Sequence, residues 1–104
     1  MVIKSVLKEE LINSKRLKQR YEKELRALPK GHLSAKKIKG RIYYYLMSRH
    51  ENKIRSAYKG KLGQDDIAKY EQIKKNKAKY RNLLSKVKKQ IIFLRKALRG
   101  KEEV

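Results

Sequence analysis

Residues 70–98 read YEQIKKNKAKYRNLLSKVKKQIIFLRKAL and carry the strongest structural signal in the chain. Their seam side chains recur at alternating spacings of three and four, which is typical of an amphipathic helix with one narrow contact stripe. The seam residues are Tyr70, Ile73, Lys77, Tyr80, Leu84, Val87, Ile91, Leu94 and Leu98. Gly100 suits a helix end. The sequence therefore predicts a long helix over residues 64–100, followed by a tail over 101–104.

A weaker stripe of the same kind runs through the N-terminal segment, which we expect to be a helix over residues 1–28. Its members are Leu7, Leu11, Ser14, Lys18, Tyr21, Leu25 and Leu28. Because neither seam is wide enough to stabilise an isolated helix, we expect an antiparallel coiled-coil pair within one chain. A coiled coil between two chains is the alternative. Ile92 and Phe93 lie off the seam and indicate an additional contact, such as a homodimer.

The middle segment, residues 29–63, changes period. The run IYYYLM at residues 42–47 is rich in aromatic and branched side chains and favours a strand. The Lys-Gly pair at residues 39–40 suits a two-residue hairpin turn, and a second turn over residues 50–53 returns the chain. The fold class is therefore α+β: an N-terminal helix, a three-stranded antiparallel β-meander and a long C-terminal helix in a single domain.

The first turn fixes the register of its hairpin and so separates two faces of the sheet. The apolar face carries Leu33, Ala35, Ile42, Tyr44 and Leu46, and we expect it to dock on the helices. The tyrosine face carries Lys36, Arg41, Tyr43, Tyr45 and Arg49.

The faces of the third strand depend on the length of the second loop. A three-residue loop adds Arg55 and Lys59 to the tyrosine face. A two-residue turn swaps the faces of this strand. We favour the three-residue loop because it keeps Ile54 and Tyr58 directed inward.

Positive charge dominates the composition, with 31 Lys and Arg against 10 Asp and Glu and a formal net charge of +21. A chain of 104 residues with this charge repels itself unless an anion binds, so DNA or RNA is the expected partner. Residues 29–63 hold ten basic residues and one acid, and residues 72–101 hold twelve and none. Solvated surfaces usually mix both signs, so this imbalance favours an anionic partner.

Two surfaces are candidates for nucleic-acid binding. On the sheet, we expect Tyr43, Tyr45 and Arg41 to reach the bases. The cations expected to hold phosphates are Lys36, Lys39, Arg49, Lys53, Arg55 and Lys59. On the long helix, Lys74, Arg81, Lys88 and Arg95 recur every seven residues and form a basic line beside the seam. We call this line of four cations the helix edge. Taken singly, each tyrosine is also explained as an ordinary strand former, and each lysine or arginine as a solvated cation. The prediction therefore rests on the clustering of these residues.

The residue patterns that are typical of an enzyme, a metal site or a disulfide framework are absent from the sequence. Without cysteine there is no disulfide framework, thiolate metal site or cysteine nucleophile. The two histidines are far apart, and no phosphate-binding glycine loop is present, so we expect no enzyme, cofactor or metal. The acid pairs at residues 9–10 and 65–66 fall in expected first turns, where they complement the helix dipole. We expect a cytoplasmic protein without a signal peptide or membrane contact, because no long apolar run exists.

The middle segment resembles a family of short, basic proteins of prokaryotes and mobile elements. The resemblance rests on LPKGHL at residues 28–33, KKIKGR at 36–41 and YYYL at 43–46, continues with RSAYKG at 55–60, and covers about residues 25–100. The hairpin is also similar, more weakly, to three-stranded DNA-binding domains of phage-type integrases and transposases. These likenesses imply a sheet placed in a groove and a phage or mobile-element origin, but no activity that carries over.

The expected function is therefore non-enzymatic nucleic-acid binding. The alternative is a coiled-coil protein-interaction module that docks on a host nucleoprotein, such as an anti-CRISPR inhibitor of a CRISPR effector. Association with ribosomes or the nucleoid is a third interpretation. The sequence does not choose DNA over RNA.

Overall fold

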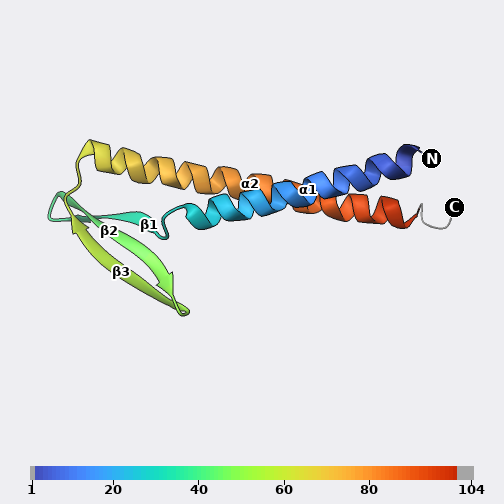
Figure 1. Ribbon diagram of the computed structural model, residues 1–104. Helices are drawn as coiled ribbons and strands as arrows, with labels where there is room; N and C mark the ends of the chain where they lie inside the picture. Colours follow the sequence, from blue (N-terminus) through green and yellow to red (C-terminus); the bar gives the residue numbers. More distant parts are fainter. Residues whose placement is uncertain (1, 101–104) are drawn as a thin grey trace. The chain divides into compact units, whose positions relative to one another are not determined.

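The computed structural model describes residues 2–100, so the expected tail over 101–104 lies outside the described residues. The elements are α1 (Val2–Ala27), β1 (His32–Ile38), β2 (Arg41–His50), β3 (Lys53–Gly60) and α2 (Gln64–Arg99) (Figure 1). They form two compact units. The helix unit combines α1 with α2 from Lys77 onward, and the sheet unit comprises residues 28–76.

In the helix unit, α1 and the second part of α2 run antiparallel and pack along their seams (Figure 1). The rings of Tyr21 and Tyr80, one from each seam, lie with their centroids 6.2 Å apart. Among the residues that the structure describes, the buried apolar side chains are Val87, Ile91, Leu94 and Leu98, all of them seam residues. Ser14, one of the polar seam positions of α1, is 2% exposed. The periodicity therefore predicted both the partners and the contact face correctly.

The ends of α2 match the local signals in the sequence. The helix begins at Gln64, where the Ile67 amide donates a hydrogen bond of 3.1 Å to the Gly63 carbonyl oxygen. The two acids at residues 65–66 lie in this first turn, where they complement the helix dipole. The acids at residues 9–10 do not lie in the first turn of their helix, because α1 already begins at Val2 and its first turn holds no acid. That part of the capping prediction was wrong.

The sheet has the strand order β1-β2-β3, with both neighbouring pairs antiparallel. In the first hairpin Lys36 lies opposite Tyr43, and Leu33 lies opposite Leu46. This is the register that a two-residue turn at residues 39–40 predicts. Leu33 and Leu46 therefore share the apolar face, and Lys36 and Tyr43 share the tyrosine face.

The second hairpin differs from the register that we favoured. Its turn contains two residues, 51–52, so that His50 pairs with Lys53 instead of closing a three-residue loop. Glu51 and Asn52 both have positive φ angles, 49° and 66°, as the common tight hairpin turn requires. This turn swaps the faces of β3, because side chains alternate at every residue. Tyr58 consequently pairs with Tyr45.

Candidate nucleic-acid interface

Three tyrosine rings gather on the tyrosine face. The ring of Tyr58 lies 5.3 Å from that of Tyr45 and 6.3 Å from that of Tyr43, measured between centroids. The ring planes are inclined by 54° and 37° respectively, so the three rings form a tilted cluster rather than a parallel stack. The middle strand supplies two rings at alternating positions, and β3 supplies the third.

A break in the β2–β3 register adjoins this cluster. Tyr45 pairs with Tyr58, but the preceding residue, Tyr44, pairs with Gly60, which leaves Lys59 at the irregularity. Gly60 has a φ of +71°, a conformation that glycine adopts without strain. A Cβ atom at this position would lie 3.5 Å from the Tyr58 hydroxyl oxygen. The Tyr58 ring therefore folds back beside the backbone of Gly60.

A lysine from β1 completes the cluster. The Nζ atom of Lys36 lies 4.9 Å from the centroid of the Tyr45 ring, within the range of a cation–π interaction. Lys36 is nevertheless exposed, so its ammonium group remains accessible to an anion. Positive charge and an aromatic surface thus occur side by side on this face.

The rings border an open hollow of about 520 Å³. Its lining residues are Ile38, Tyr43, Tyr45 and Tyr58. Tyr58 is 61% exposed, and Ile38 is also exposed. The tyrosine face therefore presents apolar and aromatic surface to solvent within the sheet unit.

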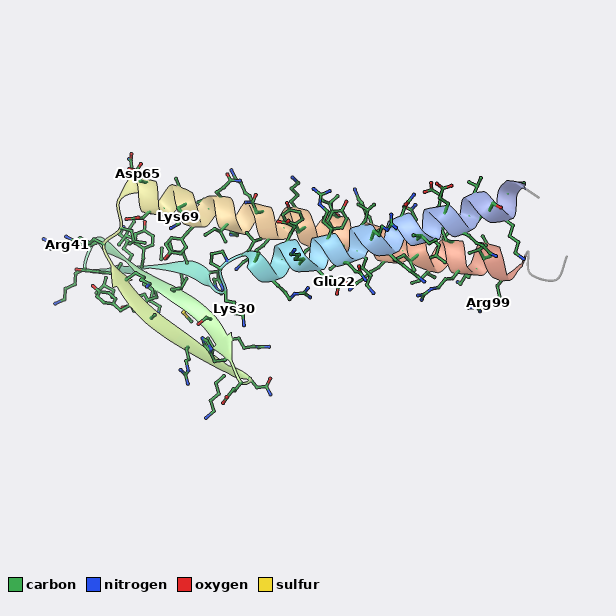
Figure 2. All side chains as sticks on the ribbon, viewed as in Figure 1. Glu22, Lys30, Arg41, Asp65, Lys69 and Arg99 are labelled. Carbon is green, nitrogen blue, oxygen red and sulfur yellow. The ribbon has the colours of Figure 1, made fainter. Side chains whose placement is uncertain are left out.

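The structure brings together only part of the expected set of nucleic-acid-binding cations. The strand register keeps three cations on the tyrosine face, as expected: Lys36, Arg41 and Arg49. Figure 2 shows Arg41 at the end of the sheet where the first turn lies. Arg41, which we expected to reach a base, and Arg49, which we expected to hold a phosphate, are both exposed and so remain accessible to a ligand.

The remaining cations of the sheet lie elsewhere. Arg55 pairs with Ser48 and Lys53 pairs with His50, which puts both cations on the opposite face from Tyr45. The expectation that Arg55 joins the tyrosine face was wrong, because the second turn is one residue shorter than we favoured. Lys59 lies at the irregular register, so strand alternation no longer assigns it to that face. Lys39 belongs to the first turn.

The helix edge is divided between the two units. Arg81, Lys88 and Arg95 lie on the part of α2 that belongs to the helix unit, and all three are exposed. A spacing of seven residues returns nearly to the same side of a helix, so they form one line beside the buried seam. Lys74 is also exposed, but it belongs to the sheet unit.

One seam lysine adds positive charge near this line. The pKa of Lys77 is lowered from its usual value of 10.5, first by burial and second by the charge of Arg81. Both causes disfavour the ammonium form of Lys77. The seam thus accepts a charged residue at an electrostatic cost.

Sequence reasoning missed Tyr58 and Ile38 as parts of the candidate interface. The signal for Tyr58 was Asn52, because asparagine tolerates the positive φ angle of a two-residue turn better than most residues. Ile38 lies opposite Arg41 in the first hairpin, so the predicted register already assigned it to the tyrosine face. Its contribution to a hollow followed only once Tyr58 was placed there.

The chain matches no protein-family model, no curated protein and no solved structure. Within residues 2–100, no group of three or more His, Cys, Asp or Glu side chains is arranged to hold a metal ion. Over their described lengths, neither α1 nor α2 has the length and apolar character needed to cross a membrane. Function is therefore inferred from the side chains of the two surfaces themselves.

Proposed function

We propose that this protein binds nucleic acid without catalysing a reaction, and that the tyrosine face of its sheet makes the principal contact. The observation that supports this proposal is the cluster of Tyr43, Tyr45 and Tyr58 with the ammonium group of Lys36. Cations attract the phosphate backbone, whereas aromatic rings stack on bases. The exposed cations Arg41 and Arg49 on the same face extend the surface available to the backbone, so this proposal assigns Arg41 to a phosphate rather than to a base.

The helix edge supplies a second, purely electrostatic contact in this proposal. Arg81, Lys88 and Arg95 are exposed cations on one line of α2, so they would hold phosphates rather than read bases. Binding would therefore be strongly salt-dependent and have little sequence specificity. A nucleic-acid partner would place the protein in the cytoplasm, and a phage or mobile-element origin remains our expectation.

The proposal can be tested with two double variants that remove equal charge from opposite faces of the sheet. Arg41→Gln with Arg49→Gln alters the tyrosine face, and Lys53→Gln with Arg55→Gln alters the opposite face. Affinity for a labelled oligonucleotide is measured by fluorescence anisotropy over a salt series. Loss of two phosphate contacts should lower the slope of log affinity against log salt by roughly 1.8 for duplex DNA or 1.4 for a single strand.

The opposite-face variant is the matched control, and its slope should change little. Equal changes in both variants would contradict the proposed interface, because net charge alone would then explain the binding. Circular dichroism of each variant verifies that the sheet and helices are retained.

Docking on a protein is the second candidate function, and the exposed apolar residues of α2 favour it. Ile92 is 53% exposed and Phe93 is 67% exposed, which makes an apolar patch on the helix unit. Under this alternative, Tyr43→Ala with Tyr45→Ala would spare the affinity for free nucleic acid. A large loss of that affinity would instead support the tyrosine face as the nucleic-acid interface.

A further inference from the structure

The hollow on the tyrosine face is bordered by aromatic surface that is exposed to solvent rather than buried within the fold. Tyr58 is 61% exposed, although its ring lies 5.3 Å from Tyr45. Its ring therefore covers Tyr45 only in part, and the tilt of 54° leaves ring surface accessible from solvent. Ile38 adds an exposed aliphatic wall to the same hollow. A flat aromatic guest would bury these surfaces together.

The charge around the hollow decides which aromatic guests are favourable. Clusters of tyrosines can also hold organic cations by cation–π attraction. Here the ammonium group of Lys36 already lies 4.9 Å from the Tyr45 ring, and Arg41 shares the same face. The formal charge of +21 further opposes the approach of a cation. A guest that joins an aromatic ring to an anion can stack on the tyrosine rings and be attracted by the cations at the same time.

A nucleotide has this combination, with a flat base and a phosphate. The base would occupy the hollow, against Tyr58 and Ile38, while the phosphate lies toward Lys36. Paired bases inside a duplex are stacked on both faces, and only an unpaired base exposes a face to a protein ring. The guest must therefore be unpaired.

We infer that the hollow bordered by Ile38, Tyr43, Tyr45 and Tyr58 binds an unpaired nucleobase of single-stranded DNA or RNA. This inference rests on the proposed nucleic-acid function and specifies its ligand. Tyr58 provides the most accessible side of the hollow, because it is the most exposed of the three rings. The helix edge, a line of exposed cations, binds the backbone of either form.

The test compares single-stranded and duplex oligonucleotides of one sequence with three proteins: the natural chain, Tyr58→Leu and Tyr58→Phe. Leucine keeps apolar bulk but removes the aromatic face, whereas phenylalanine keeps the ring and removes only the hydroxyl. Tyr58→Leu should weaken single-strand binding by about 5- to 150-fold, the range for loss of one stacked base. Tyr58→Phe should change it by less than about threefold, a small effect beside that of losing a stacked base. Duplex affinity should hardly change in either variant.

A second measurement uses the natural chain, so it does not depend on the folding of a variant. A single strand carrying one 2-aminopurine between pyrimidines is titrated with protein, and the fluorescence of that base should fall as it stacks on a tyrosine ring. DNA and RNA versions of the strand distinguish the two sources of the base. A preference for either form is compatible with the inference.

Two results would overturn the inference. One is equal loss of single-strand and duplex affinity in Tyr58→Leu, and the other is unchanged 2-aminopurine fluorescence when the strand is fully bound. In both cases nucleic-acid binding itself persists, and the proposed function stands without the base pocket. Absence of binding to every oligonucleotide would instead overturn the proposed function.

Discussion

Replacing Ile91 by alanine should destabilise the helix unit much more than the same replacement at the adjacent Ile92. Ile91 belongs to the seam and is 6% exposed, whereas Ile92 lies off the seam and is 53% exposed. Both variants lose the same side-chain atoms and gain the same helix propensity of alanine. The difference between them therefore isolates burial in the helix pair.

The expected magnitudes follow from these exposures. Truncation removes roughly three methylene equivalents, which at about 0.8 kcal/mol each gives about 2.4 kcal/mol at a buried site and about half of that at Ile92. The propensity of alanine returns about 0.4 kcal/mol at both positions. A cavity left at Ile91 adds to its loss. The free energies of unfolding should thus differ by at least about 1.2 kcal/mol, or roughly 5–10 °C in melting temperature for a chain of this size.

Thermal unfolding of the two variants, followed by helix circular dichroism at several protein concentrations, checks this difference. Similar losses in both variants would refute the reasoning, because Ile92 would then be as buried in solution as the seam residue. If the melting temperature of the natural chain also fell on dilution, the burial of Ile92 would be in a homodimer.

Gly31→Ala should destabilise the sheet more than Gly40→Ala in thermal unfolding, although both glycines have positive φ angles. A Cβ atom at Gly31 would lie 2.7 Å from the Met47 carbonyl oxygen, whereas the same atom at Gly40 meets nothing within 4 Å. Asn52→Val should destabilise the second hairpin by about 1–2 kcal/mol, because a branched residue resists the positive φ of this position. Asn52→Gly should not destabilise it, and chemical denaturation distinguishes the two variants. The unfolded chain binds the Lys77 proton more tightly than the folded one, because burial lowers the folded pKa. Stability should therefore rise with pH through that lowered pKa toward 10.5, and unfolding of Lys77→Gln measured across this range should lack that component of the rise.

The helices were predictable from the sequence because their contact face repeats. From Tyr80 to Leu98, each turn of α2 carries a seam residue at alternating spacings of four and three, so an error at one position does not move the face. The polar seam residues Ser14 and Lys18 did not break this pattern, because Ser14 is small enough to be buried at 2% exposure and Lys18 stays half-buried. The exposure of Ile92 and Phe93 followed from the same periodicity.

The sheet was less predictable because its faces depend on single residues in the turns. The Lys-Gly pair at residues 39–40 specified the first hairpin, and its register was correct. The Glu-Asn pair at residues 51–52 is a weaker turn signal, since a non-glycine residue must adopt a positive φ at both positions. One residue in the loop length then decides whether Tyr58 or Arg55 joins the tyrosine face.

The candidate interface shows the same division. Tyr43, Tyr45 and Lys36 were predictable, because they lie on one well-specified hairpin. The hollow was not, because it needs the third ring from β3. The charge clusters were visible in the sequence, but the division of the helix edge between two units has no local signal.

The most direct test of nucleic-acid binding is fluorescence anisotropy of the purified protein with labelled duplex DNA, single-stranded DNA and RNA across a salt series. Binding at low salt alone is uninformative at this charge, because any polyanion attracts the chain. We expect micromolar or tighter affinity to persist near 0.15 M salt, roughly the physiological ionic strength, with a preference for single strands. Collapse of all binding by that salt concentration would contradict nucleic acid as the direct target.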